Sequence, residues 1–295
     1  MNRNIKVLCT IGPKSFKKDV ISFFLKNKVD IFRINMSHTS ISELEVKIKY
    51  LKKLNVKNIC IDTEGAQVRT ANIKKKFFFK KGQKLTFSND INNKLHFQFY
   101  PYFSFNKIKL KSIFKVGFEG LQLQVISKSN KFLKAKVVSE GNIENNKGVH
   151  FDQQINLNCL TLKDRSAIEI AKKLNVKHFA LSFANSLRDV KLFRNLIGKK
   201  AFLISKIETK EAYKNIRKIT KTSNAILIDR GDLSRYFPIE KIPIIQKMIL
   251  NKAKLLKTEC YIATNLLESM IINFYPTRAE SNDIYSCLES GAKGL

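Results

Sequence analysis

Short apolar runs alternate with stretches of helical spacing along most of this sequence. The runs have the length and the Val, Ile, Leu and Phe content of buried strands. They cover residues 5–11, 29–36, 58–61, 178–183, 201–205, 225–228 and 260–263. Apolar residues three and four apart follow almost every run, as in Ile41, Leu44, Ile48 and Leu51. Alternating strands and helices indicate a parallel sheet, and seven such units predict most of a TIM (β/α)8-type barrel.

The later helices of this pattern are predicted at 187–196, 210–220, 240–256 and 278–290. Residues 161–164 resemble a helix start, and 277–280 have the spacing of a capping box. An eighth strand is expected to begin at Gly294-Leu295, where the sequence stops, so the barrel is predicted to be truncated before strand 8. A barrel without that strand exposes two edges. Either a partner or a second copy fills the gap, or the chain is a fragment.

The helical spacing disappears between about 72 and 155. Lys74–Gly82 and Leu121–Ile126 have the composition of short strands, and just over half of the 22 Phe residues fall in this stretch. Lysines interleaved with Phe could stack on nucleic-acid bases, but a small β-barrel with Phe in its core is the better interpretation. We therefore predict three segments: barrel at 1–71, an inserted β-rich lid domain at 72–155, and barrel again at 156–295.

Composition narrows the classes of function. The net charge of +31 invites a nucleic-acid interpretation, but only ten residues are Arg and the Lys are spread over the whole chain. Because no recognition helix, zinc pattern or RNA-binding strand motif is present, nucleic acid is disfavoured as a partner. A solvated basic surface is the preferred explanation, and a basic mouth that attracts small polyanionic substrates also fits.

Hydropathy and cysteine usage suggest a cytoplasmic protein. No apolar stretch reaches the roughly 18 residues of a membrane helix, and the first apolar run is too short for a signal peptide. The five cysteines are scattered and contain no Cys-x-x-Cys pair, which favours reduced thiols over a disulfide framework or a zinc site.

Polar side chains at the ends of the apolar runs carry the candidate chemistry. Arg33, Asn35 and Ser37 share one face of their strand because side chains alternate along it. Lys206 and Glu208 share a face in the same way. A cation, an amide and a hydroxyl suit phosphate oxygens and a monovalent cation. A carboxylate beside a Lys, with a second one such as Asp232, suits Mg²⁺ and phosphoryl transfer. Each fragment alone also fits a surface face, an ion pair, a turn or a helix cap; their order at successive strand ends favours an active site.

The order and the residues of these motifs resemble those of the pyruvate kinase family from the first strand to the last residue. The matching segments are VLCTIGP at 7–13, FRINMSH at 32–38, IDTEGAQVRT at 61–70, KGV at 147–149, ISKIE at 204–208, RGDL at 230–233, ATNLLESM at 263–270 and PTRAE at 276–280. The resemblance implies an enzyme of glycolysis that converts phosphoenolpyruvate and ADP into pyruvate and ATP, with the insertion as a mobile lid.

The resemblance also implies roles for individual residues. Lys206, Arg33, Arg69 and Thr264 would be catalytic, and the substrate would contact Arg33, Lys206, Gly231, Asp232 and Thr264. Mg²⁺ or Mn²⁺ would be held by Glu208 and Asp232. K⁺ would be held by Asn35, Ser37, Asp62 and the carbonyl of Thr63. The nucleotide would lie near Asn35, His38, Arg69 and Lys147.

Several positions depart from the family pattern. They are Glu64 for Lys, Ala66 for Pro, Gln67 for Glu, Glu119 for the second Asp of a lid motif, Asp229 for a small residue, Asn265 for Gln and 234–236 for Gly-x-Glu. The family's eighth strand, its Ser-Gly-Glu-Thr segment and its C-terminal regulatory domain have no counterpart here. The alternative hypothesis is therefore an impaired or truncated relative that binds phosphoenolpyruvate or nucleotide in a regulatory role.

Overall fold

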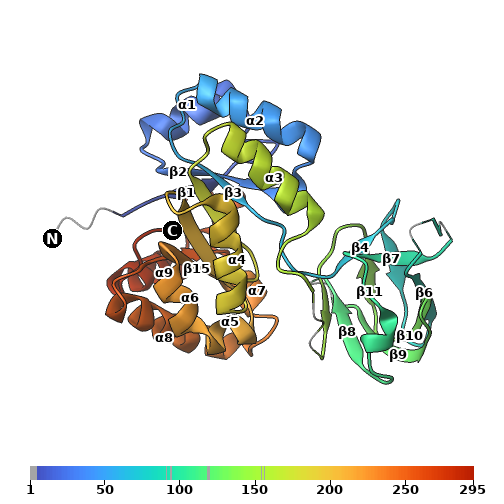
Figure 1. Cartoon of the computed structure of the whole chain (residues 1–295). Helices are drawn as coiled ribbons and strands as arrows, with labels where there is room; N and C mark the ends of the chain where they lie inside the picture. Colours follow the sequence, from blue (N-terminus) through green and yellow to red (C-terminus); the bar gives the residue numbers. More distant parts are fainter. Residues whose placement is uncertain (1–4, 91, 94, 118–119, 154, 156) are drawn as a thin grey trace. The chain divides into compact units, whose positions relative to one another are not determined.

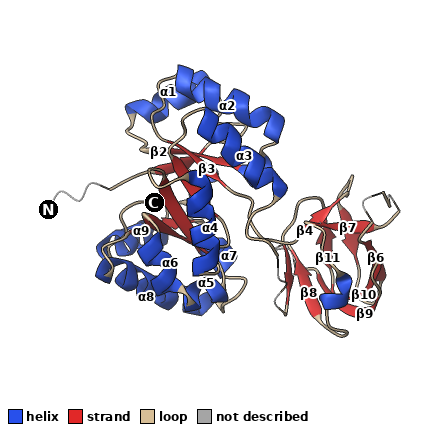
Figure 2. Ribbon diagram, viewed as in Figure 1, coloured by secondary structure: helices blue, strands red, loops and turns tan. Residues whose placement is uncertain are grey.

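The computed structural model describes residues 5–90, 92–93, 95–117, 120–153, 155 and 157–295. The chain divides into two compact units, one of residues 1–65 and 159–295 and the other of residues 66–158. Figure 1 shows the first unit as strands surrounded by helices, and Figure 2 shows the second as almost entirely strands and loops.

The core of the first unit is a parallel sheet whose strands follow one another in sequence order. Its members among the described residues are β1 (Leu8–Thr10), β2 (Ile31–Asn35), β3 (Ile59–Asp62), β13 (His178–Leu181), β14 (Phe202–Ile207), β15 (Ala225–Asp229) and β16 (Glu259–Ala263). Every pairing between neighbours is parallel. All carboxyl ends therefore lie at one edge, which is where a barrel of this kind gathers its polar side chains.

Helices connect these strands. They are α1 (Lys18–Lys26), α2 (Ile41–Lys53), α3 (Leu162–Lys173), α4 (Leu187–Ile197), α5 (Lys210–Lys214), α6 (Ile216–Thr222), α7 (Arg230–Leu233), α8 (Ile242–Leu255) and α9 (Arg278–Glu289), with 3-10 turns η1 (Met36–His38), η3 (Ile239–Lys241) and η4 (Glu268–Ile271). Leu44, Ile48 and Leu51 of α2 are buried, as their spacing predicts. In the described part of the chain, no helix is both long enough and apolar enough to cross a bilayer.

The helix predicted at 210–220 is divided in two. Asn215 ends α5 and begins α6, and its side-chain amide donates to the carbonyl of Asn185 at 2.9 Å. This bond to a distant loop gives Asn215 a partner outside the helix, at the point where α5 ends and α6 begins. Helical periodicity alone does not register such a tertiary contact.

The two outer strands of the sheet are both bonded to the last residues of the chain. Gly294 forms parallel bridges with Lys6 and with Tyr261, and the amide of Ile262 donates to the Gly294 carbonyl at 3.1 Å. A side chain at position 294 would place its Cβ 2.4 Å from the Lys6 carbonyl oxygen and 2.8 Å from the Tyr261 ring, so only glycine fits. The last residues of the chain therefore bridge the two edges of the parallel sheet, at Lys6 and at Tyr261.

The second unit is built from short, mostly antiparallel strands. They are β4 (Arg69–Ala71), β5 (Phe77–Phe79), β6 (Lys84–Ser88), β7 (Phe97–Tyr100), β8 (Ile113–Val116), β9 (Gln122–Lys128), β10 (Phe132–Ser139), β11 (Gly141–Ile143) and β12 (Val149–Phe151), with the turn η2 (Phe105–Lys107). The larger sheet has the order β12-β8-β9-β10-β6-β7-β4, and an antiparallel bridge from Arg69 to Gly148 links its two ends.

Phenylalanine fills the interior of this unit. Phe87, Phe99, Phe105 and Phe114 are fully buried, and the rings of Phe87 and Phe99 stack with centroids 4.5 Å apart. Buried rings contribute large apolar areas and favourable ring geometry. These side chains serve as core residues, so they are not available for stacking on nucleic-acid bases.

Asp164 anchors the start of α3 to the loop after β3. Its carboxylate accepts hydrogen bonds from the amides of Glu64 at 2.8 Å, Gly65 at 3.2 Å and Thr161 at 3.0 Å. The side chain is buried and the Thr161 hydroxyl completes a capping box with it. One carboxylate thus satisfies three backbone donors contributed by two segments far apart in sequence.

We predict that Asp164→Ala lowers the free energy of unfolding by about 2–4 kcal/mol, because it leaves buried amides without acceptors. Urea unfolding followed by far-ultraviolet circular dichroism measures the change. Glu169→Ala, an exposed acid on the same helix, is the matched control and should shift stability by less than about 0.5 kcal/mol. Equal effects of the two substitutions would contradict the anchoring role.

Candidate active site at the carboxyl ends of the strands

Lys206, near the end of β14, is surrounded by carboxylates. Its Nζ lies 2.8 Å from Oε1 of Glu208 and 3.4 Å from Oδ2 of Asp62. Oδ2 of Asp229 lies 3.5 Å from the same nitrogen. Nζ also donates to the hydroxyl of Ser182 at 3.2 Å. Since Lys206 is only 5% exposed, these oxygens stand in for the water that an ammonium group requires.

Arg33 of β2 adds a second cation to this group. Its Nε and Nη2 donate to Oδ2 of Asp62 at 2.7 and 2.5 Å, and Nη1 donates to the hydroxyl of Thr10 at 2.6 Å. The register of β2 and β3 places Asn35 directly beside Asp62. Asp62 therefore links the two cations, while its other oxygen accepts from Ser182 at 3.1 Å.

Burial and crowded charge shift the pKa values of these groups. Burial alone would lower the pKa of Lys206, but the carboxylates of Asp62, Glu208 and Asp229 raise it above its usual value. Burial raises the pKa of Glu208, and the nearby Asp232 and Asp229 raise it further against the opposing effect of Lys206. Lys206 is therefore a permanent cation at neutral pH, and any additional positive charge beside Glu208 would favour the ionised form of its carboxyl group.

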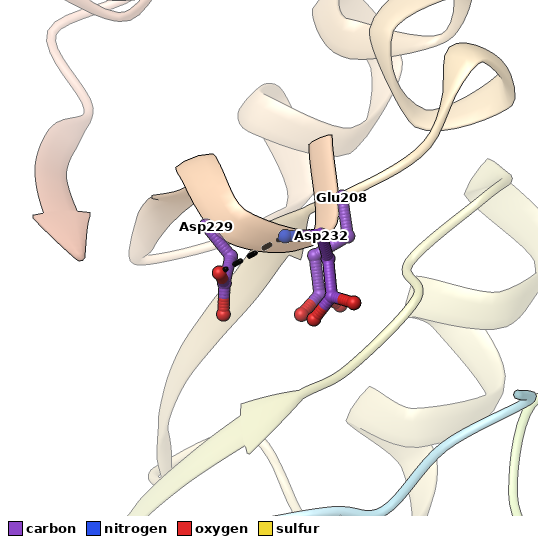
Figure 3. A group of neighbouring side chains, drawn as sticks. All are labelled: Glu208, Asp229 and Asp232. Atoms are coloured by element: carbon purple, nitrogen blue, oxygen red, sulfur yellow. Dashed lines mark hydrogen bonds between the residues drawn. The ribbon is translucent and has the colours of Figure 1, made fainter. Parts of the chain in front are cut away.

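Three carboxyl groups form a cluster that includes two of the neighbours of Lys206. Oxygen atoms of Glu208, Asp229 and Asp232 all lie within 4.8 Å of one another, and Figure 3 shows their side chains extending in the same direction. Oε2 of Glu208 is fixed by the amide of Phe183 at 2.6 Å. Hard oxygen donors at this spacing are the ligands that Mg²⁺ and Mn²⁺ prefer, so the donor set fits a divalent cation.

Thr264, after β16, has a strained backbone. Its φ is 79°, and Asn265 also has a positive φ of 56°. A positive φ is costly for a β-branched residue and persists only where the surroundings enforce it. Arg230 does so here: its guanidinium donates to the Thr264 carbonyl at 2.7 Å and to Asp283 of α9 at 2.7 Å.

The remaining predicted residues of the first unit lie on the same strand ends. The side-chain oxygen of Asn35 accepts from the amide of Ser37 at 3.0 Å and caps η1, which ends at the exposed His38. The hydroxyl of Thr63 accepts from the amide of Ser182 at 3.0 Å. Gly231 lies in α7, where a Cβ would meet the Thr264 methyl at 2.8 Å, so glycine allows the close approach of the two loops.

Two predicted residues belong to the second unit. Arg69 donates to the carbonyl of Asn146 at 3.3 Å, and Nζ of Lys147 forms an ion pair with Glu144 at 2.9 Å. Glu119, the altered position of the lid motif, lies outside the described residues.

Glu64, one of the altered positions of the first unit, has structural contacts. It accepts from the hydroxyl of Thr161 at 2.7 Å and pairs with Lys163 at 3.3 Å. These contacts place Glu64 in the junction between the loop after β3 and the start of α3, beside the Asp164 anchor.

Sequence analysis assigned no role to three groups that hold the site together, namely Ser182, Arg230 and Asp283. Arg230 stands inside the matching segment at 230–233, so the sequence identified the residue but not its contacts. Ser182 follows β13 and was visible only as one residue near a strand end. Their partners lie far away in sequence, so no local pattern could have identified the contacts.

Fold and site together define an α/β-barrel protein with a buried lysine, an arginine and a carboxylate cluster at the carboxyl ends of its strands. Such a site suits an anionic ligand and a divalent cation. The family profile described as "Pyruvate kinase, barrel domain" matches residues 2–294. The chain therefore belongs to the pyruvate kinase family.

Curated relatives agree with this assignment. The chain is 34% identical over 305 residues to the pyruvate kinase of Thermotoga maritima, covering 99% of this chain and 66% of that protein. It is 33% identical over 300 residues to the pyruvate kinase of Methanocaldococcus jannaschii, covering 100% of this chain and 64% of that protein. The pyruvate kinase of Clostridium perfringens is 31% identical over 306 residues, with 98% and 64% covered. The chain thus spans 64–66% of the length of these relatives.

We predict that Lys206→Met destabilises the first unit by about 3–5 kcal/mol, because it leaves buried carboxylates without their counter-charge. Thermal and urea unfolding measure the loss. Lys254→Met, which removes an exposed lysine from α8, is the control for the loss of one positive charge and should have little effect. A Lys206→Met protein as stable as the control would show that the buried ion cluster does not contribute to stability.

Proposed function

We propose that the chain catalyses phosphoryl transfer from phosphoenolpyruvate to ADP, giving pyruvate and ATP, as a step of cytoplasmic glycolysis. The observation that carries the proposal is the buried Lys206 ammonium, held between Asp62 and Glu208 at the carboxyl ends of the strands. Phosphoryl transfer depends mainly on positioning and on charge stabilisation. A fixed cation beside a carboxylate cluster supplies both.

The substrate would be held by groups on four strand ends. Arg33 and Lys206 would contact the phosphoryl oxygens, and their positive charge would stabilise the phosphoryl group as it leaves the enol oxygen for an ADP oxygen. The amides of Gly231 and Asp232 and the hydroxyl of Thr264 would hold the substrate carboxylate. The enol left behind takes up a proton on its methylene carbon, near Thr264, to become pyruvate.

Glu208 and Asp232 would hold Mg²⁺ or Mn²⁺, and the cluster they form with Asp229 fits such an ion. When bound, the cation would neutralise phosphate and carboxylate charge and fix the donor in the site. The chain's own contribution is to orient Glu208, whose carboxylate is fixed by Lys206 and by the amide of Phe183.

Further roles rest on the family resemblance. We assign K⁺ to Asn35, Ser37, Asp62 and the carbonyl of Thr63, supported by the pairing of Asn35 with Asp62 in the sheet. We assign contacts with the nucleotide to Asn35, His38, Arg69 and Lys147.

A second candidate function is a relative that binds phosphoenolpyruvate or nucleotide without turning it over. Asp229 favours the absence of turnover, because its carboxylate accepts a hydrogen bond at 2.5 Å from the Thr264 hydroxyl, which the first proposal places near the carbon that takes up the proton. Ligand binding without turnover would support this alternative over the first.

We predict that the purified chain, with Mg²⁺ and K⁺, forms pyruvate from phosphoenolpyruvate and ADP. A coupled assay of pyruvate measures the rate. Lys206→Ala should reduce turnover by a factor of about 10³ or more, since preorganised charge supplies much of such catalysis. Lys254→Ala should retain full activity. No turnover from the folded wild-type protein would contradict catalysis and leave the binding-only function.

Loss of Lys206 also destabilises the barrel, so Thr264 supplies an independent part of the same test. Thr264→Ala removes the hydroxyl while Thr264→Ser retains it, and neither substitution removes a buried charge. The alanine variant should lose about 10-fold or more in kcat/KM, the usual scale for one lost polar contact in a site. The serine variant should stay close to wild type. Similar losses in both variants would contradict the role of the hydroxyl.

The carboxylate cluster predicts a divalent-cation site that can be measured without turnover. Glu208→Gln should weaken Mn²⁺ binding about 10-fold or more, because it removes one charged oxygen ligand. Electron paramagnetic resonance of free Mn²⁺ follows the titration. Glu211→Gln in α5, outside the cluster, is the control and should leave the affinity unchanged. If both variants bind Mn²⁺ equally well, Glu208 is not a ligand.

A further inference from the structure

Asp229, the last residue of β15, belongs to the carboxylate cluster and also has partners outside it. Oδ1 accepts from the hydroxyl of Thr264 at 2.5 Å and from the amide of Asp232 at 3.5 Å. Oδ2 lies 3.5 Å from Nζ of Lys206. The side chain is 15% exposed, so its negative charge is balanced largely by these protein groups.

The Thr264 hydroxyl and the Asp232 amide are two of the three donors that the proposed function assigns to the substrate carboxylate, and Lys206 is assigned to its phosphoryl group. A hydroxyl has a single proton to donate. While Thr264 donates to Asp229, it cannot donate to a second carboxylate. Two carboxylates at one set of donors would also repel each other strongly in a site of low dielectric constant.

We infer that Asp229 determines specificity: its carboxylate occupies the position of the substrate carboxylate, so the site discriminates against ligands that carry a carboxylate there. This inference rests on the proposed function. Phosphoenolpyruvate binds only when the hydrogen bond between the Thr264 hydroxyl and Asp229 is broken. The free energy needed to break that bond weakens the binding of phosphoenolpyruvate.

Local structure holds Asp229 in this position. It is the N-cap of α7 and its backbone belongs to β15, which is paired on both sides. Arg230, the next residue, fixes the carbonyl of Thr264, so donor and acceptor are held from both ends. Burial raises the pKa of Asp229, but Lys206 and the Thr264 hydroxyl outweigh that effect and lower it.

The cluster offers a second position for the displaced carboxylate. Oxygen atoms of Asp229, Glu208 and Asp232 lie within 4.8 Å of one another (Figure 3). A divalent cation there would attract Asp229 toward it and away from Thr264. The binding test is therefore made at one fixed, saturating concentration of Mg²⁺.

The test is an equilibrium titration of phosphoenolpyruvate into the wild-type chain and into Asp229→Ala, by isothermal calorimetry. Asp229→Ala should bind about 10-fold more tightly or better, which corresponds to about 1.4 kcal/mol. Asp229→Asn, which keeps the shape and removes the charge, should lie between the two. Glu240→Ala removes an exposed acid outside the site and should match wild type. Thermal unfolding verifies that each variant is folded.

Inorganic phosphate, which has no carboxylate, serves as the second ligand. The gain from Asp229→Ala should be clearly larger for phosphoenolpyruvate than for phosphate. Equal gains for both ligands would mean a general charge effect and would overturn the inference, as would unchanged affinity for phosphoenolpyruvate. Tighter phosphoenolpyruvate binding by Asp229→Ala without turnover in either protein would support the inference while the catalytic function fails. If neither protein binds phosphoenolpyruvate, the inference and the proposed site both fall.

Discussion

The buried ammonium of Lys206 is the interaction on which the rest of the site depends. An isolated charge at this depth would be strongly unfavourable, and each carboxylate around it would be unfavourable without the lysine. Together, Lys206, Asp62, Glu208 and Asp229 compensate one another at distances of 2.8–3.5 Å. The lysine comes from β14 and its partners from the ends of β3, β14 and β15. The parallel sheet therefore has to be formed before these charges are balanced.

Outside the charged centre, loops are fixed by bonds between segments that are distant in sequence. Asp164 gathers the amides of the loop after β3, and Arg230 holds Thr264 in an unfavourable backbone conformation. These contacts have the same physical role: each fully satisfies a buried or strained group that would otherwise favour another arrangement. The helices carry the core packing, and the polar bonds select one geometry of the loops at the strand ends.

Much of this architecture could be predicted because it depends on patterns of residues that are close together in the sequence. Runs of apolar residues predicted strands such as β14 and β15, and helical spacing predicted the buried face of α2. The polar residues at strand ends identified Lys206, Glu208 and Asp232 as candidate site residues. The division of one helix at Asn215 and the roles of Ser182 and Arg230 could not be predicted, since each depends on a partner 24 or more residues away. The contact between Asp229 and Thr264 belongs to the same class, although Thr264 stands in a recognised motif and Asp229 directly precedes one.

The local charge of the site differs in sign from the charge of the chain. The protein as a whole has a net charge of +31, yet Arg33 and Lys206 stand here among four carboxyl groups, those of Asp62, Glu208, Asp229 and Asp232. A phosphorylated carboxylic acid would add further negative charge to this site, in which carboxyl groups already outnumber the cations. The basic surface can raise the concentration of such an anion nearby, but it cannot neutralise charge inside the site. A divalent cation at the carboxylate cluster would correct this imbalance, and it would do so at the position from which Asp229 faces both the cluster and Thr264. On the proposed function, metal binding and acceptance of an anionic substrate would be coupled through the carboxylate of Asp229.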